Sequence, residues 1–360
     1  MPIVKKVRKL GARGGFGVAA RETSSARPQF VPKEPPCEHS CPNGTDVRAF
    51  LMALGRTVEI EEGFRQAFLV IAERNPLPAV CSRLCPHHCE ASCNRDGYDG
   101  AVAVSQVERA VADFAIRHGW PLPALAGDPR HERVLVIGAG AAGLSAAYQL
   151  ARRGHSVTLC DPHAEPGGEL RYGFEAQRLP RAVLDAEIAR ILALGVTFVS
   201  DPACEPAMPR VIRTKVHEDG RKVEAAAIPA AIHFGRHAVE LLAADIAGME
   251  IHAALRLPAA TKEQVRFDHY PRQARLGAAG AGGEPGPPDG ALSPEQAVAE
   301  ARRCLSCGAC FECDNCWKFC PDQAVIKPLE KGQPYRFRLE FCQGCNKCAE
   351  ECPSGFIEMR

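Results

Sequence analysis

The sequence predicts a multidomain chain of mixed α+β and α/β class: a helical N-terminal domain, a central parallel α/β domain and a small cysteine-rich C-terminal domain. Three observations predict it. Sixteen of the 18 cysteines lie in two blocks, at 37–93 and 304–352. A strand-like run and a glycine-rich turn stand between the blocks. The 360 residues suffice for two or three domains at about 150 residues each.

Composition narrows the class of protein. The 44 Lys and Arg nearly balance the 43 Asp and Glu, so nothing indicates a nucleic acid or an anionic membrane as partner. Disulfide frameworks this rich in cysteine belong mainly to short secreted chains. The first 27 residues lack the apolar stretch of a signal peptide, and no run reaches the ~18 apolar residues of a membrane helix. We therefore expect a cytoplasmic protein without a membrane span, whose thiols serve metal or redox chemistry.

The first domain, expected over residues 1–130, is predicted to be helical around its cysteines. Apolar residues recur at helical spacing on both sides of the segment 81–93, and prolines interrupt the helices between them. Cysteines at four-residue steps in that segment favour a metal site. The periodic positions are Phe64, Ala67, Phe68 and Ile71, then Val107, Ala110, Val111 and Phe114.

A strand, a helix and a second strand follow one another in the second domain, expected over residues 131–260. The apolar runs 134–137 and 156–160 predict the two strands. Parallel neighbours need a crossover connection, so this is the unit of a Rossmann-type sheet.

The turn after the first strand, GAGAAG, has the spacing of a dinucleotide-binding loop. Its glycines permit a tight turn, a close approach to a pyrophosphate and close packing of helix on strand. The helix N-terminus stabilises the phosphate charge, and an acidic residue after the second strand accepts from a ribose hydroxyl. A glycine-rich turn without a ligand is the alternative. The residues expected at the cofactor are Gly138, Ala139, Gly140, Ala142, Gly143 and Asp161.

A flexible linker is expected over residues 261–291, because nine of the 14 residues at 277–290 are Gly or Pro. The third domain, residues 292–360, then opens with a helix. Ser293 can cap this helix, Pro294 suits its first position and Gln296 completes a capping box.

The C-terminal cysteines repeat one motif, C-x-x-C-x-x-C-x-x-x-C-P. Three thiolates at steps of three residues reach one cubane, whereas the fourth completes the other cluster. Zinc, the alternative, needs only four ligands and does not explain a duplicated run with the same proline. The surplus Cys304 and Cys307 are either alternative ligands or buried thiols. We assign one [4Fe-4S] cluster to Cys310, Cys313, Cys316 and Cys352, and the other to Cys342, Cys345, Cys348 and Cys320.

This end of the chain, residues 304–360, resembles bacterial-type two-cluster ferredoxins. The stretch DPHAEPGGELRYG, residues 161–173, resembles the FAD site of the glutamate synthase small subunit and its relatives. That resemblance implies FAD as the cofactor and adds Gly168 and Leu170 to its site.

The first cysteine block resembles the N-terminal iron-sulfur domain of the same flavoproteins and of dihydropyrimidine dehydrogenase. The matching motifs are Cys37-x-x-x-Cys41-Pro, NPLPAVCSRLCPHHCEASCNR at 75–95 and the helix around Glu108. The resemblance implies a [4Fe-4S] cluster held by Cys41, Cys85, Cys89 and Glu108, and it matches Cys37 and Cys93 to a second cluster. Two further cysteines that some relatives carry upstream are absent, and only Cys81 is spare to serve the second site with Cys93. We therefore expect one or two N-terminal clusters.

Full-length relatives also insert a second dinucleotide domain that binds NAD(P)H, which this chain lacks between residues 199 and 230. The flavin domain is therefore shortened, and NAD(P) is not expected to bind. The leading hypothesis is a flavin and iron-sulfur oxidoreductase subunit of the glutamate synthase small subunit type, which relays electrons between FAD and a partner. Ferredoxin, a reductase or a catalytic subunit are the candidate partners. The alternatives are a flavin-free, ferredoxin-like electron-transfer subunit and a truncated member without its own NAD(P)H activity.

Overall fold

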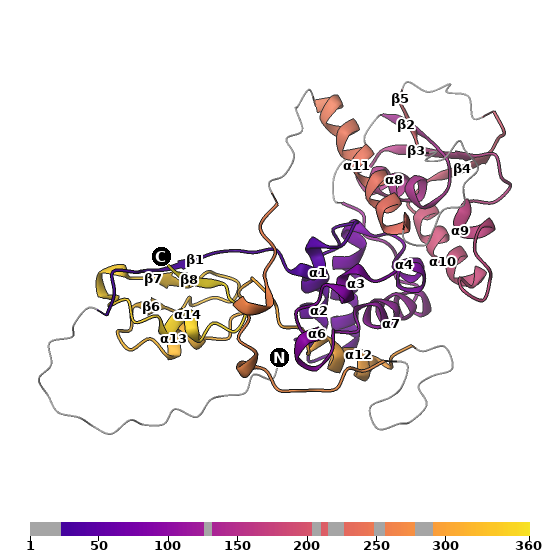
Figure 1. Ribbon diagram of the computed structural model, residues 1–360. Helices are drawn as coiled ribbons and strands as arrows, with labels where there is room; N and C mark the ends of the chain where they lie inside the picture. The colour runs from indigo at the N-terminus through magenta and orange to yellow at the C-terminus, as the bar shows by residue number, and fades with distance from the viewer. Residues whose placement is uncertain (1–22, 126–131, 204–209, 215–226, 248–255, 278–290) are drawn as a thin grey trace, which may run out of the picture.

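The computed structural model describes residues 23–125, 132–203, 210–214, 227–247, 256–277 and 291–360. Figure 1 shows a central group of helices, a sheet with its own helices on one side, and a small part formed by the C-terminal residues on the other. The expected mixed α+β and α/β class is confirmed. No described helix is both long enough and apolar enough to cross a membrane.

The central group holds short helices whose apolar faces meet in one core. Phe64, Phe68 and Ile71 are buried from one helix and Val107 and Val111 from another, as their spacing predicts. Pro86 separates the two helices that carry Cys81 and Cys89. The helices are α1 (Pro36–His39), α2 (Val47–Gly55), α3 (Ile60–Arg74), α4 (Pro78–Leu84), α5 (His88–Ala91), α6 (Asp96–Asp99) and α7 (Val104–Arg117).

The sheet has four parallel strands in the order β4-β3-β2-β5. Its helices provide the crossovers that parallel strands require. The carboxyl ends of β2 and β3 therefore lie side by side, where Gly138 and Asp161 follow their strands. The elements are β2 (Arg133–Ile137), α8 (Ala141–Ala151), β3 (Ser156–Asp161), α9 (Glu169–Tyr172), α10 (Arg181–Leu192), β4 (Thr197–Ser200), β5 (Arg210–Arg213) and α11 (Ile228–Ala247).

Helix α11 packs along α8. A Cβ atom on Gly235 would stand 2.0 Å from the carbonyl oxygen of Ala142, so glycine at this position allows the two helices to approach. Among the described residues the sheet part thus has one glycine-rich turn, and α11 covers the helix that starts from it. Residues 215–226, within the region where a second dinucleotide domain was expected to be missing, lie outside the described ranges.

The small part on the left of Figure 1 contains an element that the sequence analysis placed in the N-terminal domain. Strand β1 (Pro28–Phe30) pairs antiparallel with β8 (Ile357–Met359), with Phe30 opposite Ile357. The buried Lys33 Nζ lies 2.7 Å from a carboxylate oxygen of Glu358 and strengthens this connection. The other elements are α13 (Asn315–Lys318), β6 (Val325–Ile326), β7 (Arg336–Phe337), η4 (Leu339–Phe341) and α14 (Lys347–Glu350).

The segment expected as a linker is structured in its described part. Residues 256–277 carry η2 (Lys262–Gln264) and η3 (Phe267–His269), whereas residues 278–290 lie outside the described ranges. Helix α12 (Pro294–Ala301) starts with the capping box predicted for Ser293 and Gln296. It packs on α2, α3 and α7 of the central helices, because its apolar face is buried there.

Candidate functional site

The glycine-rich turn between β2 and α8 has the geometry of a dinucleotide-binding loop. Gly138 has a φ of 99°, which favours glycine. A Cβ atom on Gly143 would stand 1.7 Å from the carbonyl oxygen of Gly138, so the third glycine permits the close helix packing that the motif requires. A Cβ atom on Gly140 would meet nothing within 4 Å. Open space at Gly140 fits the approach of a pyrophosphate to the backbone.

The loop that follows β3 packs on this turn. A Cβ atom on Gly168 would lie 3.0 Å from the Cα of Gly140, and Leu170 is buried just behind it. The structure therefore brings Gly168 against Gly140 and Ala139 of the turn, and Leu170 is buried in the same core cluster as Ala139. Of the residues expected at the cofactor, Gly140 and Gly168 are partly exposed and the others are buried.

Asp161 stands at the end of β3, as expected, and is buried. One carboxylate oxygen accepts a hydrogen bond from the Ala139 backbone N–H at 2.8 Å. The other accepts from the His163 backbone N–H at 3.0 Å, and lies 2.7 Å from His163 Nδ1. A carboxylate has about four acceptor positions, so Asp161 both fixes the turn and retains capacity for a ribose hydroxyl.

A second group of candidate residues lies where α1, α4, α5 and α7 meet. Burial raises the pKa of the Cys85 thiol to about 11, with nearby Glu108 and Cys41 adding to the rise. Burial also raises the pKa of Cys89, and the charges of Glu108, Cys41 and Cys85 add to it. The four residues predicted to hold the first N-terminal cluster are therefore neighbours.

Glu108 is the non-cysteine member of this group. Its Oε1 accepts a hydrogen bond from Asn75 Nδ2 at 3.2 Å, and burial raises its pKa to about 8. The same Asn75 side chain accepts from the Cys81 thiol at 3.7 Å through its oxygen. The Cys81 thiol therefore points to Asn75. It does not line the cavity that Cys37 and Cys93 line.

Cys37 and Cys93, matched to a second cluster by resemblance, line one hollow between α1 and the end of α5. The same hollow is lined by Cys304 and Cys307, the two surplus cysteines of the sequence analysis. Sequence reasoning left their role open, although their Cys-x-x-Cys spacing is that of the ferredoxin motif.

The third group contains cysteines of both C-terminal motifs: three cysteines of the first motif line one hollow together with the last cysteine of the second. The cavity at the centre of this hollow has a volume of about 20 Å³. Aromatic rings of Phe30, Phe356 and Tyr335 close it. The cysteines that line it are Cys310, Cys313, Cys316 and Cys352.

The fourth group joins the other three cysteines of the second motif to Cys320. Burial raises the pKa of Cys348 to about 12, with the charges of Cys342, Cys320 and Cys345 adding to the rise. Backbone N–H groups donate to these sulfurs, from Ala324 to Cys320 at 3.3 Å and from Gly344 to Cys342 at 3.5 Å. Such bonds stabilise negative charge on sulfur, which is the charge that cluster ligation requires.

All sixteen cysteines of the two blocks are free thiols. Over the described ranges, no three His, Cys, Asp or Glu side chains converge closely enough to hold a single metal ion. Around one zinc ion, thiolate sulfurs stand about 4 Å apart, whereas a cubane keeps its ligands at four separate corners. The cysteine groups therefore fit iron-sulfur clusters, which would supply one-electron transfer.

Comparison with known families agrees with this arrangement. Residues 21–120 match a family described as dihydropyrimidine dehydrogenase domain II, 4Fe-4S cluster. Residues 133–327 match FAD dependent oxidoreductase, and residues 335–358 match a 4Fe-4S binding domain.

Three curated relatives are subunits of larger oxidoreductases. The NAD-dependent dihydropyrimidine dehydrogenase subunit PreT of Escherichia coli is 39% identical over 45% of this chain and 39% of its own length. The NADP(+)-dependent formate dehydrogenase subunit beta of Moorella thermoacetica is 34% identical over 52% of this chain and 29% of its own. The NADPH-Fe(3+) oxidoreductase subunit beta of Geobacter sulfurreducens is 33% identical over 46% and 24%.

The chain thus spans less than half of the length of each of these relatives. The flavin family covers more than half of the chain and is flanked by iron-sulfur domains. This chain belongs to the FAD-dependent oxidoreductases, as a member with an N-terminal iron-sulfur domain and a C-terminal 4Fe-4S ferredoxin motif.

Proposed function

We propose that this chain is an electron-relay subunit, which passes electrons between FAD and its ferredoxin part and from there to a redox partner or catalytic subunit. Flavin exchanges electrons in pairs or singly, whereas each cluster carries one. A flavin beside a row of clusters therefore splits or gathers electron pairs. We also propose that the chain is of the glutamate synthase small subunit type and that it works in the cytoplasm.

One observation carries the proposal: the four-stranded sheet with its helices, here called the flavin part, contacts the helices that hold the first cysteine group. Arg236 of α11 donates to the carbonyl oxygen of Asn43 at 3.0 Å, two residues beyond Cys41. Glu187 of α10 accepts from the backbone N–H groups of Ala79 and Val80 at 2.8 and 3.1 Å, at the start of the helix that leads to Cys85. These contacts hold the flavin part against the first cluster site.

Anaerobic purification with FAD, iron and sulfide measured per chain tests the relay. We expect one FAD and at least about twelve irons per chain. Photoreduction of the flavin should then be followed by loss of the clusters' visible absorbance. About eight irons without flavin would contradict the proposal, because only the ferredoxin part would then carry electrons.

A flavin-free electron carrier is the second candidate. The observation that favours it is that Ala139 and His163 already occupy most of the acceptor positions of Asp161, which leaves little for a ribose hydroxyl. Titration of the flavin-depleted protein with FAD separates the two candidates, since a carrier would leave FAD free. Addition of NADH or NADPH tests the expected loss of the nicotinamide domain, because prompt cluster reduction would reveal a nicotinamide site.

A further inference from the structure

Four cysteines from opposite ends of the chain line a single hollow. Cys37 follows the first strand and Cys93 ends the first cysteine block, whereas Cys304 and Cys307 follow α12. The rest of the lining is mainly apolar, with Leu51, Val102, Val104 and Leu305 among it. The cavity at the centre of this hollow has a volume of about 30 Å³.

The lining of this hollow can be compared with that of the first cysteine group in the C-terminal ferredoxin motif. That group lines a cavity of about 20 Å³, also with four thiols, and the rest of the lining is mainly apolar apart from Asp314 and Ser354. Free cysteines are often buried simply as small apolar residues. Here, however, four thiols from separate segments of the chain converge on one cavity, as they do at the first ferredoxin site. The two cavities therefore fit the same kind of group.

The backbone of the loop 304–307 supports the comparison. In this loop, the second residue after the first cysteine and the residue after the second cysteine both have positive φ, at 53° for Ser306 and 69° for Gly308. The ferredoxin loops have positive φ at the same two positions, at 59° and 67° for Glu312 and Asp314, and at 71° and 64° for Gly344 and Asn346.

This conformation costs a residue with a side chain roughly 1–2 kcal/mol, so its repetition indicates a function. It also aims a backbone N–H at sulfur. Ser306 donates to Cys304 Sγ at 3.5 Å, and Gly344 donates to Cys342 Sγ at the same distance. The loop 304–307 is therefore shaped like a cluster-binding loop.

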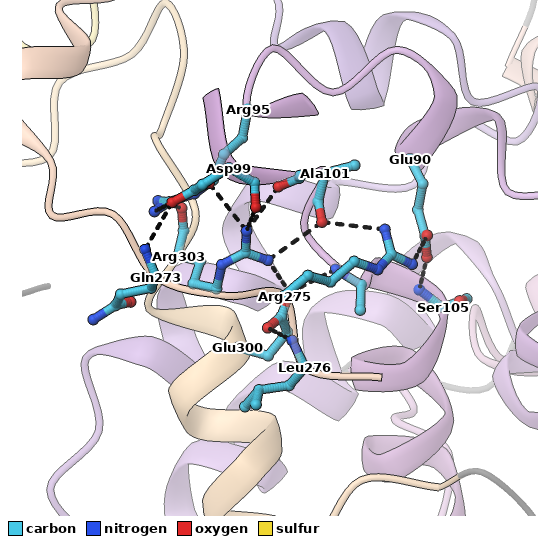
Figure 2. Close-up of polar contacts among 12 residues, drawn as sticks. Glu90, Arg95, Asp99, Ala101, Ser105, Gln273, Arg275, Leu276, Glu300 and Arg303 are labelled. Carbon is cyan, nitrogen blue, oxygen red and sulfur yellow. Dashed lines mark hydrogen bonds and ion pairs between the residues drawn. The ribbon is translucent and has the colours of Figure 1, made fainter. Parts of the chain in front are cut away.

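A buried ion network holds this loop against the first cysteine block (Figure 2). Arg303, next to Cys304, binds Glu300 and Asp99, with nitrogen-to-oxygen distances of 2.5 and 3.1 Å. Arg95, two residues after Cys93, binds Asp99 and donates to the Arg303 carbonyl oxygen. Both arginines are 1% exposed. Such a buried network is costly unless all its charges are paired, so it fixes the position of Cys304 relative to Cys93.

We propose that Cys37, Cys93, Cys304 and Cys307 ligate a [4Fe-4S] cluster that links the two ends of the chain. The apolar cluster around Tyr270 contains Cys307 and contacts Cys313, so this site adjoins the first ferredoxin site. It would complete the electron path from the N-terminal cluster to the ferredoxin part. That role rests on the proposed function, whereas the site itself stands on these residues.

The test compares iron and acid-labile sulfide in anaerobically purified full-length variants. The double variant Cys304→Ser, Cys307→Ser is expected to lose about four irons and four sulfides per chain, together with one signal in the electron paramagnetic resonance spectrum of the reduced protein. The comparison variant is Cys81→Ser, since Cys81 is also buried but points to Asn75, beside the first N-terminal site. It should keep the resonance signal that the double variant loses.

Cys37→Ser approaches the site from the other end of the chain and should cause the same loss of iron. The single variant Cys307→Ser makes a smaller change and should alter the spectrum of one cluster, even if the double variant is insoluble. Unchanged iron and spectra in the Cys307→Ser and Cys37→Ser variants, loss of one zinc instead of four irons, or loss of the same resonance signal in Cys81→Ser would overturn the proposal. FAD content is read from the same samples. Loss of these irons with FAD retained supports the site independently of the flavin relay.

Discussion

Gly143 approaches Gly138 so closely that a Cβ atom on Gly143 would stand 1.7 Å from the Gly138 carbonyl oxygen. Both partners belong to the backbone of the glycine-rich turn, so neither can move aside cheaply. We expect Gly143→Ala to destabilise the flavin part by about 3 kcal/mol and to abolish FAD binding, with the ferredoxin clusters retained. FAD and iron per chain, with the thermal midpoint, would show this; normal FAD content would contradict it.

Gly140 offers the matched substitution in the same turn. A Cβ atom there meets no protein atom within 4 Å, and the φ of −77° suits any residue. Gly140→Ala should therefore leave the thermal midpoint unchanged while it weakens FAD binding by tenfold or more, about 1.4 kcal/mol. Fluorescence titration of flavin-depleted protein measures this. Wild-type affinity in Gly140→Ala would show that the pyrophosphate does not bind at this turn.

The buried carboxylate of Glu300 accepts hydrogen bonds through both of its oxygens. Its oxygens accept from the backbone N–H groups of Ala103 and Leu276 and from Arg303, all at 2.8 Å or less. Glutamine would turn an N–H₂ group toward one of these donors and leave Arg303 less well paired. Glu300→Gln should cost about 3 kcal/mol and lower the iron content, because it loosens the loop 304–307.

Thermal midpoint and iron per chain of Glu300→Gln are compared with those of Glu295→Gln. Glu295 lies on the same helix, α12, but is exposed. Equal behaviour of the two variants would show that the network in Figure 2 does not hold the loop.

Short sequence patterns predicted those features that depend on interactions between residues close together in the chain. The capping box at Ser293, the apolar face around Phe68 and the turn at Gly138 all lie within a few residues of their determinants. The spacing of the two C-terminal motifs predicts that Cys352 joins the first motif's cysteines, and Cys352 and Cys310 line one cavity; the ligand assignment itself stays a prediction.

The unpredicted contacts join distant segments. Cys304 meets Cys93 because the apolar face of α12 packs on α2 and α7, and no local pattern states where such a face will bind. Strand β1 has only three residues, too few for an alternating pattern, so its pairing with β8 depends on Phe30 and Lys33 finding distant partners.

Glu187 is expected to make the stability of the fold depend on pH. This fully buried carboxylate binds the start of α4, and burial raises its pKa to about 7. A carboxyl whose folded pKa lies above its unfolded value binds more protons when folded, so stability is highest below the unfolded value. It falls as pH rises from about 4.5 to 7, by up to about 3 kcal/mol.

The Glu187→Gln variant has lost this titration, so its thermal midpoint should change less between pH 5 and pH 7.5 than that of the wild type. It should also be lower at pH 5, since an amide cannot accept from both backbone N–H groups. Glu61→Gln, at an exposed position of α3, controls for loss of charge. Parallel pH profiles for wild type and Glu187→Gln would rule out this role of Glu187.

Phe30 closes the hollow of the first ferredoxin site from outside the C-terminal part. Its ring lies 4.6 Å from that of Phe337 and 5.2 Å from that of Phe356, between centroids. Phe30→Ala should lower the free energy of unfolding by about 2 kcal/mol and admit water and oxygen to the cluster. We expect the visible absorbance of this variant to bleach in air several-fold faster than that of the wild type. Phe341→Ala, which removes an exposed ring of the same part, should bleach at the wild-type rate. Equal rates in the two variants would mean that β1 does not shield this cluster.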